Sequence, residues 1–262
     1  MESKRLIFHA LQLHRERGDD HGVAEALGRL CTINQTLGLF KEGMQQVEET
    51  LEIAQRLGDT VRQAQCLKDL ALLLHDNNQL DVAEEAAFCM INLLSERDDP
   101  FLVCESHKTL GKIYRSKGEM EKAIHHFEVA LGTASSFGWH DELFSTHYNL
   151  AWLYRDEGRL DDAQAHAERA KSHAVNIPYN LGLAMEMQAV IWYRQDRLEE
   201  AKTEALRAAD VFEKLGAAGV AKDCRDFLRK IENSLVATSG QPALNCELLQ
   251  TTLFPAHIDF SF

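Results

Sequence analysis

Histidine and cysteine are the residues of this chain best suited to metal or nucleophilic chemistry. The 262 residues include 12 histidines and 6 cysteines. His166 and His173 stand seven positions apart, about 10 Å along a helix, which is too far for both to bind one ion. His125 and His126 are adjacent and point to different sides of a helix. The pattern therefore predicts histidines in contact with solvent, with no metal site and no cofactor.

Sequence motifs of enzymes are missing as well. The chain has no GxGxxG, GxSxG, HExxH or CxxC pattern, and no GxxxxGK[ST] nucleotide-binding loop. Cys31, Cys66 and Cys104 lie in apolar helical stretches and are expected in the core. An enzymatic alternative needs a pocket with converging acid and base groups, which no set of residues indicates. We therefore expect a protein that is not an enzyme.

The net charge narrows the classes of partner. It is −13, with a sequence pI near 5.4. Such a field repels phosphate backbones and anionic lipid surfaces, and no cluster of lysine and arginine opposes it locally. No signal peptide and no apolar run of transmembrane length are present in the sequence. We expect a cytoplasmic protein that binds neither nucleic acid nor membrane.

The elements that position the side chains repeat every 40 residues. One marker is formed by Gly18-Asp19, Gly58-Asp59, Asp98-Asp99 and Gly138-Trp139, and a second by Gly38, Asn78, Gly118 and Gly158. A fixed period of this size indicates a stack of small units, each of which needs its neighbours to bury its apolar face. Such a stack offers a surface for a partner rather than a catalytic pocket.

The third repeat shows the pattern of one unit most clearly. Leu110, Ile113 and Tyr114 share one face of a predicted helix, and Gly118 ends that helix. A second helix follows with Ala123, Phe127, Ala130 and Leu131 on its inner face. The unit is therefore predicted to be a pair of antiparallel helices.

These residues resemble the tetratricopeptide repeat (TPR) superfamily, in a form with a 40-residue period. The matching positions are Leu110-Gly111, Tyr114, Gly118, Ala123, Phe127 and Ala130-Leu131. The resemblance implies an all-α fold, a right-handed α-solenoid of antiparallel helix pairs. From about Arg5 to Asn233, the sequence is also similar to the C-terminal TPR arrays of fungal signalling proteins with an NB-ARC or NACHT nucleotide switch (STAND proteins).

The repeat also divides the chain. We expect a half repeat over 1–17, formed by a second helix only, and five TPR-like repeats over 18–215. A capping helix is expected over 216–235, followed by an apolar and flexible tail over 236–262. Two alternatives remain open: the tail docks as a peptide on this array or another, and the uncapped half repeat associates with a further segment or chain.

The resemblance further implies that the first helix of each pair lines a concave groove. Carried onto this sequence, the candidate groove residues are Lys68, His75, Lys108, Lys112, Arg115, Tyr148, Trp152, Arg155, Tyr193 and Arg194, with Glu105 and Glu186 beside them. This row is net basic with aromatic rings beside the cations. It predicts a peptide- or protein-binding groove whose partner carries acidic groups.

Two other interpretations compete with this one. Lys108, Lys112 and Arg115 can instead pair with Glu105 or with acids of the next helix. The paired asparagines of chaperone-binding TPR domains are missing, which argues against a chaperone partner. As a function of a different class, the array would serve as the partner-sensing or autoinhibitory arm of a nucleotide switch that lies outside this chain.

Overall fold

The computed structural model describes residues 2–94, 99–174 and 176–238, and this part of the chain contains helices and no strand. Its twelve helices are α1 (Glu2–Arg17), α2 (Asp20–Thr36), α3 (Phe40–Leu57), α4 (Thr60–Asp76), α5 (Leu80–Leu94), α6 (Pro100–Lys117), α7 (Met120–Phe137), α8 (His140–Asp156), α9 (Leu160–His173), α10 (Pro178–Arg194), α11 (Leu198–Lys214) and α12 (Ala218–Thr238).

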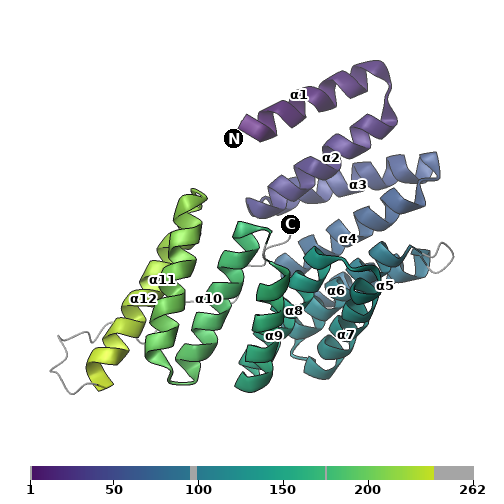
Figure 1. The fold of residues 1–262 in the computed structure, drawn as a ribbon. Coiled ribbons are helices and arrows are strands. Elements are labelled where there is room, and N and C mark those ends of the chain that lie inside the picture. The colour runs from purple at the N-terminus through teal and green to yellow at the C-terminus, as the bar shows by residue number, and fades with distance from the viewer. Residues whose placement is uncertain (1, 95–98, 175, 239–262) are drawn as a thin grey trace. The chain divides into compact units, whose positions relative to one another are not determined.

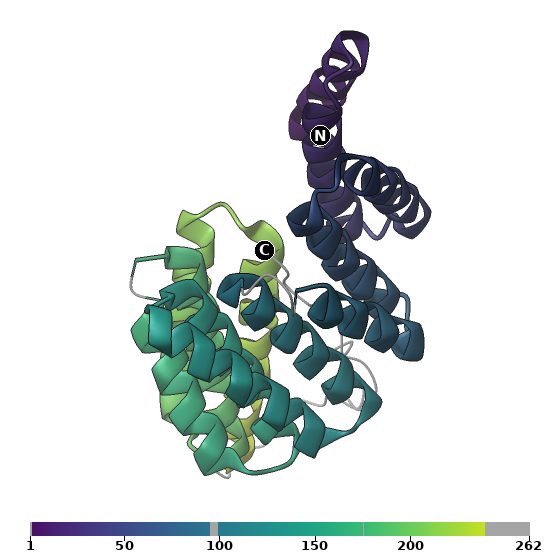
Figure 2. The same ribbon diagram turned by 90° about the vertical axis from the view of Figure 1, so that its right-hand side faces the viewer.

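The helices belong to two compact units, residues 1–133 and 134–262. Within the first unit, α2 packs on α3 and α4 on α5, and within the second unit, α8 packs on α9 and α10 on α11 (Figure 1 and Figure 2). First helices of successive pairs also touch, as α2 touches α4, α4 touches α6 and α8 touches α10. The predicted all-α class is confirmed, with consecutive helix pairs packed as in a TPR-like solenoid.

The sequence markers lie at the junctions between helices. Gly18 and Gly58 adopt left-handed backbone angles, with φ of 65° at both, and so end one helix. The next residue begins another, since Asp19 and Asp59 each accept a hydrogen bond from a backbone N–H three residues on. Each marker therefore lies where one helix ends and the next begins. Such junctions recur with the helix pairs, which explains why the markers repeat along the sequence.

Close packing inside a hairpin explains the Leu-Gly step of the repeat. A Cβ atom on Gly111 of α6 would lie 2.6 Å from the ring of Phe127 of α7, whose side chain is fully buried. The predicted core cysteines Cys31, Cys66 and Cys104 are buried, as expected. Burial raises the pKa of the Cys31 thiol to about 12, so this group stays neutral.

The two ends of the described chain differ in how well they are covered. α1 packs on α2 through Leu11, while Leu6 and Phe8 of α1 are exposed. α12 packs on α11 and buries Phe227 and Ile231. α12 continues to Thr238, into the segment expected to be a tail, and the rest of that segment lies outside the described residues.

Candidate functional site

Each unit has its own candidate surface, formed by the first helices of successive pairs and here called its first-helix surface: α4 and α6 in the first unit, α8 and α10 in the second. Because α4 touches α6 and α8 touches α10, side chains on these helices reach one another across the pairs. The predicted groove residues all lie on these four helices.

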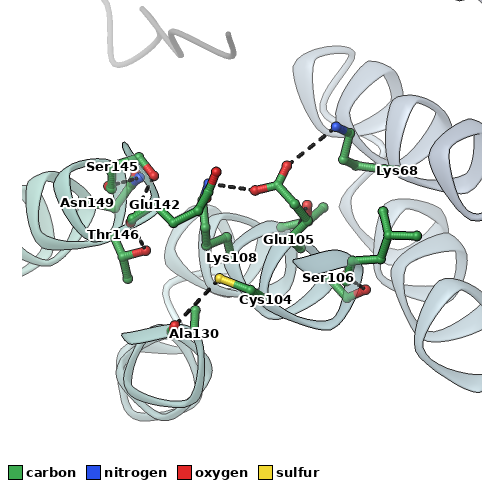
Figure 3. Close-up of polar contacts among 12 residues, drawn as sticks. Lys68, Cys104, Glu105, Ser106, Lys108, Ala130, Glu142, Ser145, Thr146 and Asn149 are labelled. Atoms are coloured by element: carbon green, nitrogen blue, oxygen red, sulfur yellow. Dashed lines mark hydrogen bonds and ion pairs between the residues drawn. The ribbon is translucent and has the colours of Figure 1, made fainter. Parts of the chain in front are cut away.

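In the first unit, two of the predicted lysines meet at one carboxylate. The Nζ atoms of Lys68 and Lys108 lie 3.4 and 2.6 Å from the two carboxylate oxygens of Glu105 (Figure 3). All three side chains are largely buried, with exposed fractions of 26%, 13% and 14% for Lys68, Lys108 and Glu105. Two cations therefore share this one carboxylate.

The other predicted members of the first unit are held more deeply. His75 is buried, with Nε2 2.8 Å from Ser116 Oγ and Nδ1 3.2 Å from a carboxylate oxygen of Asp76. Lys112 is 9% exposed, and Arg115 is partly buried. His75 therefore joins α4 to α6, and we leave it out of the proposed contact surface.

Asp69 is a charged group of this surface that the sequence patterns did not single out. It lies on α4 beside Lys68, and burial raises the pKa of its carboxyl to about 6, with Lys68 lowering and Glu105 raising that pKa. Its position in an otherwise apolar register, between Cys66 and Leu70, was the available signal.

In the second unit, aromatic rings follow one face of α8. Phe144 stacks on Tyr148 with ring centroids 5.7 Å apart, and Tyr148 meets Trp152 edge to face at 6.2 Å. The spacing of four residues places the three rings on successive turns. Tyr148 and Trp152 are both partly exposed.

Arg155 extends the same face but is engaged within the chain. Its guanidinium lies 3.6 Å from the centroid of the Trp152 ring, and one nitrogen is 2.6 Å from Asp156. Burial lowers the pKa of Arg155 and the hydrogen bond to Asp156 raises it. The cation therefore orients the indole ring by a cation–π contact.

The last turns of the first helices are tied to their neighbours. Arg194 of α10 donates a hydrogen bond of 3.2 Å to the backbone carbonyl of Arg155 on α8. The hydroxyl of Tyr193 lies 3.2 Å from Ser234 Oγ of α12, and the Nζ atom of Lys230 lies 5.2 Å from the centroid of the Tyr193 ring. Arg194 is nonetheless exposed, which leaves it accessible to a partner.

Glu186 brings a carboxyl to the α10 part of the surface. It is partly buried, and burial raises the pKa of its carboxyl to about 7. Asp223 of α12 raises this pKa further, while Arg155 lowers it. The second unit thus presents aromatic rings, an exposed arginine and a carboxyl that titrates near neutral pH.

The expectation that the histidines are solvated is wrong for two pairs. His107 of α6 and His126 of α7 bring their Nδ1 atoms to 2.9 Å, and His147 of α8 and His166 of α9 bring theirs to 3.0 Å. Both members of the second pair stand 40 residues after those of the first. The pairs form because the two helices of one hairpin face each other at these positions, and His147 is only 8% exposed.

One hollow on the described surface, of about 290 Å³, lies away from these groups. It is lined by residues of α1, α2 and α3 that include the ion pairs Arg15–Glu49 and Arg56–Asp20. Within the described residues, no group of three or more His, Cys, Asp or Glu is placed to hold a metal ion. None of the described helices is long and apolar enough to cross a membrane.

Comparison with known proteins agrees with this geometry. Residues 102–174 match the tetratricopeptide repeat family. No curated protein matches the sequence. The structure is similar to BtubC from P. vanneervenii, with 20% identity and a TM-score of 0.61 over 98% of this chain and 96% of that one. The fold is a TPR-like α-solenoid.

Two further structures share this fold at low identity. One is a Rap protein complexed with Competence and Sporulation Factor, 15% identical, with a TM-score of 0.61 over 90% of this chain and 72% of that one. The other is a STAND protein with a tetratricopeptide repeat sensor from Pyrococcus horikoshii, 16% identical, with a TM-score of 0.65. It is matched over 91% of this chain but only 41% of its own length.

Proposed function

We propose that this chain is a protein–protein interaction module that binds a peptide or protein segment on its first-helix surface. The observation that carries the proposal is the pair of partly exposed rings, Tyr148 and Trp152, on successive turns of α8. Aromatic side chains supply large contact areas at low entropic cost, and they are enriched among residues that dominate binding. A fold that presents the first helices of its pairs side by side supports this use.

Charge adds a preference for the partner. The first helices α4 and α6 carry the basic residues of the predicted groove, Lys68, Lys108, Lys112 and Arg115. This basic row favours a partner segment with acidic groups, even though the chain as a whole carries −13. The Rap protein complexed with Competence and Sporulation Factor is an example of a similar fold in a complex.

The test is a change of affinity on truncation of Trp152. A partner is first captured with the full chain and purified. We expect Trp152→Ala to weaken its binding by about 2 kcal/mol, or roughly 30-fold, because the indole is an anchor. Trp152→Phe should recover part of that loss. Leu206→Ala serves as the control, since Leu206 is an exposed apolar residue of the second helix α11.

Equal affinity of wild type and Trp152→Ala, with the helical circular dichroism of both intact, would refute the aromatic anchor. A loss in the Leu206→Ala variant of the same size would place the contact on the second helices instead.

A second candidate function is the partner-sensing or autoinhibitory arm of a nucleotide-switch protein. It is favoured by the similarity to the STAND protein with a TPR sensor, of which this chain matches 41%. The switch would lie outside this chain, which has no GxxxxGK[ST] loop. An in-frame coding region for such a loop beside the gene supports this function, and its absence from the full transcript contradicts it.

We further propose a non-catalytic protein that works in a reducing compartment such as the cytoplasm. Cys31, Cys66, Cys104 and Cys224 are free thiols in the core. Buried free thiols are typical of proteins kept under reducing conditions.

A further inference from the structure

Histidine side chains form a continuous row along the hairpin of α8 and α9. His140 and His173 bring their Nδ1 atoms to 3.1 Å, and His147 and His166 bring theirs to 3.0 Å. The ring of His173 stacks on that of His147, with centroids 5.9 Å apart and planes inclined by 7°. Four imidazoles thus stand in two rungs: an outer rung, His140 with His173, and an inner rung, His147 with His166.

The antiparallel hairpin creates the rungs. His140 and His147 are seven residues apart on α8, and His166 and His173 are seven apart on α9, so each helix presents its two rings on one face, two turns apart. Antiparallel pairing then places the start of α8 beside the end of α9. The ligands of one rung therefore come from different helices, and the distance of about 10 Å along the helix between His166 and His173 is no obstacle.

The separation within the outer rung suits two ligands of one metal ion. Bonds from a metal to imidazole nitrogen measure about 2.0–2.1 Å. Two such bonds that span 3.1 Å enclose an angle of about 100° at the ion, between the right angle of tetragonal sites and the tetrahedral angle. We propose that His140 and His173 bind one divalent transition-metal ion of the zinc, copper and nickel class, with water completing its coordination.

Exposure and charge favour the outer rung over the inner one. His140 is exposed and His173 partly exposed, so an ion can enter and keep its water ligands. His147 of the inner rung is buried, and the cation of Arg169 acts on both inner rings. A positive ion is therefore disfavoured there.

The chain contains its own comparison hairpin. α6 and α7 carry an inner rung, His107 with His126, at 2.9 Å. The positions 40 residues before His140 and His173 are Pro100 and Thr133, so this hairpin lacks an outer rung. If the outer rung binds the metal ion, the hairpin of α8 and α9 should bind it and the hairpin of α6 and α7 should not.

The experiment titrates Cu²⁺ alone into the full chain, followed by calorimetry and electron paramagnetic resonance. Every sample carries Cys89→Ser and Cys246→Ser, because the exposed thiol of Cys89 and that of Cys246, outside the described residues, would compete for copper. We expect one tight site per chain with nitrogen hyperfine coupling from two imidazoles. His140→Ala and His173→Ala should each weaken it by about tenfold or more. His107→Ala is the matched control and should leave it unchanged.

An affinity that survives in both His140→Ala and His173→Ala overturns the proposal, and the outer rung is then only a hydrogen bond between neutral rings. The same conclusion follows if His107→Ala lowers the affinity as much as they do. If His173→Ala loses its helical circular dichroism, His140→Ala decides alone, because His140 is exposed and its truncation leaves the core intact.

Discussion

Trp152 and Arg155 show how a first-helix side chain can be held in place while part of it stays exposed. The guanidinium lies 3.6 Å from the centroid of the indole and is tied to Asp156, so the ring is oriented while it stays partly exposed. His75 shows the opposite outcome, because Ser116 and Asp76 occupy both of its ring nitrogens. Residues of similar register therefore differ in how completely contacts within the chain bury them.

At the same scale, Gly111 gives a sharp prediction for stability. A Cβ atom there would lie 2.6 Å from the Phe127 ring, and this side chain is fully buried in the core. We expect Gly111→Ala to lower the free energy of unfolding by about 1–3 kcal/mol, the usual cost of overpacking. Urea denaturation followed by circular dichroism measures the change.

Gly28→Ala is the matched control for that substitution. Gly28 is also a helical glycine, in α2, but no atom lies within 4 Å of the position that a Cβ would occupy there. Alanine favours helix over glycine by about 0.5–1 kcal/mol, so this variant should be more stable than wild type. If both substitutions stabilise the protein, the tight contact between Gly111 and Phe127 is wrong.

At the scale of elements, the hairpins could be predicted because each uses local signals. Leu110, Tyr114 and Phe127 show the helical period, and the Gly-Asp steps mark helix ends. The histidine pairs could not be predicted in the same way, since they depend on how two helices are rotated toward each other. One signal was present: His107 and His147 are separated by one period.

Side-chain contacts between successive helix pairs were equally hard to predict. Lys68 meets Glu105 over a separation of 37 residues, so the contact depends on how successive pairs pack. The sequence predicted that Lys68 would lie on the first-helix surface. It did not predict that the carboxylate of Glu105 would lie beside it.

The hairpin of α6 and α7 gives a prediction on pH. Burial first, and then His107, lower the pKa of His126 to about 4, and Glu84, His125 and Lys122 act on it more weakly. The unfolded chain binds a proton near pH 6.5, whereas the folded hairpin resists it down to about pH 4. The contribution of this neutral pair to the free energy of unfolding is therefore fully present above about pH 6.5, and it is lost as the pH falls from about 6.5 to 4.

The free energy of unfolding falls by less than about 1.4 kcal/mol per pH unit for each histidine, because solvent screens these partly exposed rings. The measurement compares urea midpoints of wild type and His107→Gln/His126→Gln at about pH 7.5 and pH 5. The variant should lose less stability on acidification. Asp69 and Glu186 titrate in both proteins, so they cancel in the comparison. An equal acid sensitivity would show that the pair is not protected from protons.

At the scale of the whole molecule, each of the two units presents its own first-helix surface with a different chemistry. The first unit carries the shared carboxylate of Glu105 between two lysines, and the second carries the aromatic face of α8 beside Glu186 and Arg194. The repeat thus keeps one packing scheme and varies the side chains that this scheme leaves accessible. Variation of this kind is what a module that recognises a particular partner requires.

The most direct test of partner binding on this surface is hydrogen–deuterium exchange of the full chain with and without its purified partner. We expect slower exchange on binding in α8 and α10, around Tyr148, Trp152 and Arg194, with little change in the second helices α9 and α11. Protection confined to α9 and α11, with α8 and α10 unchanged, would contradict the account.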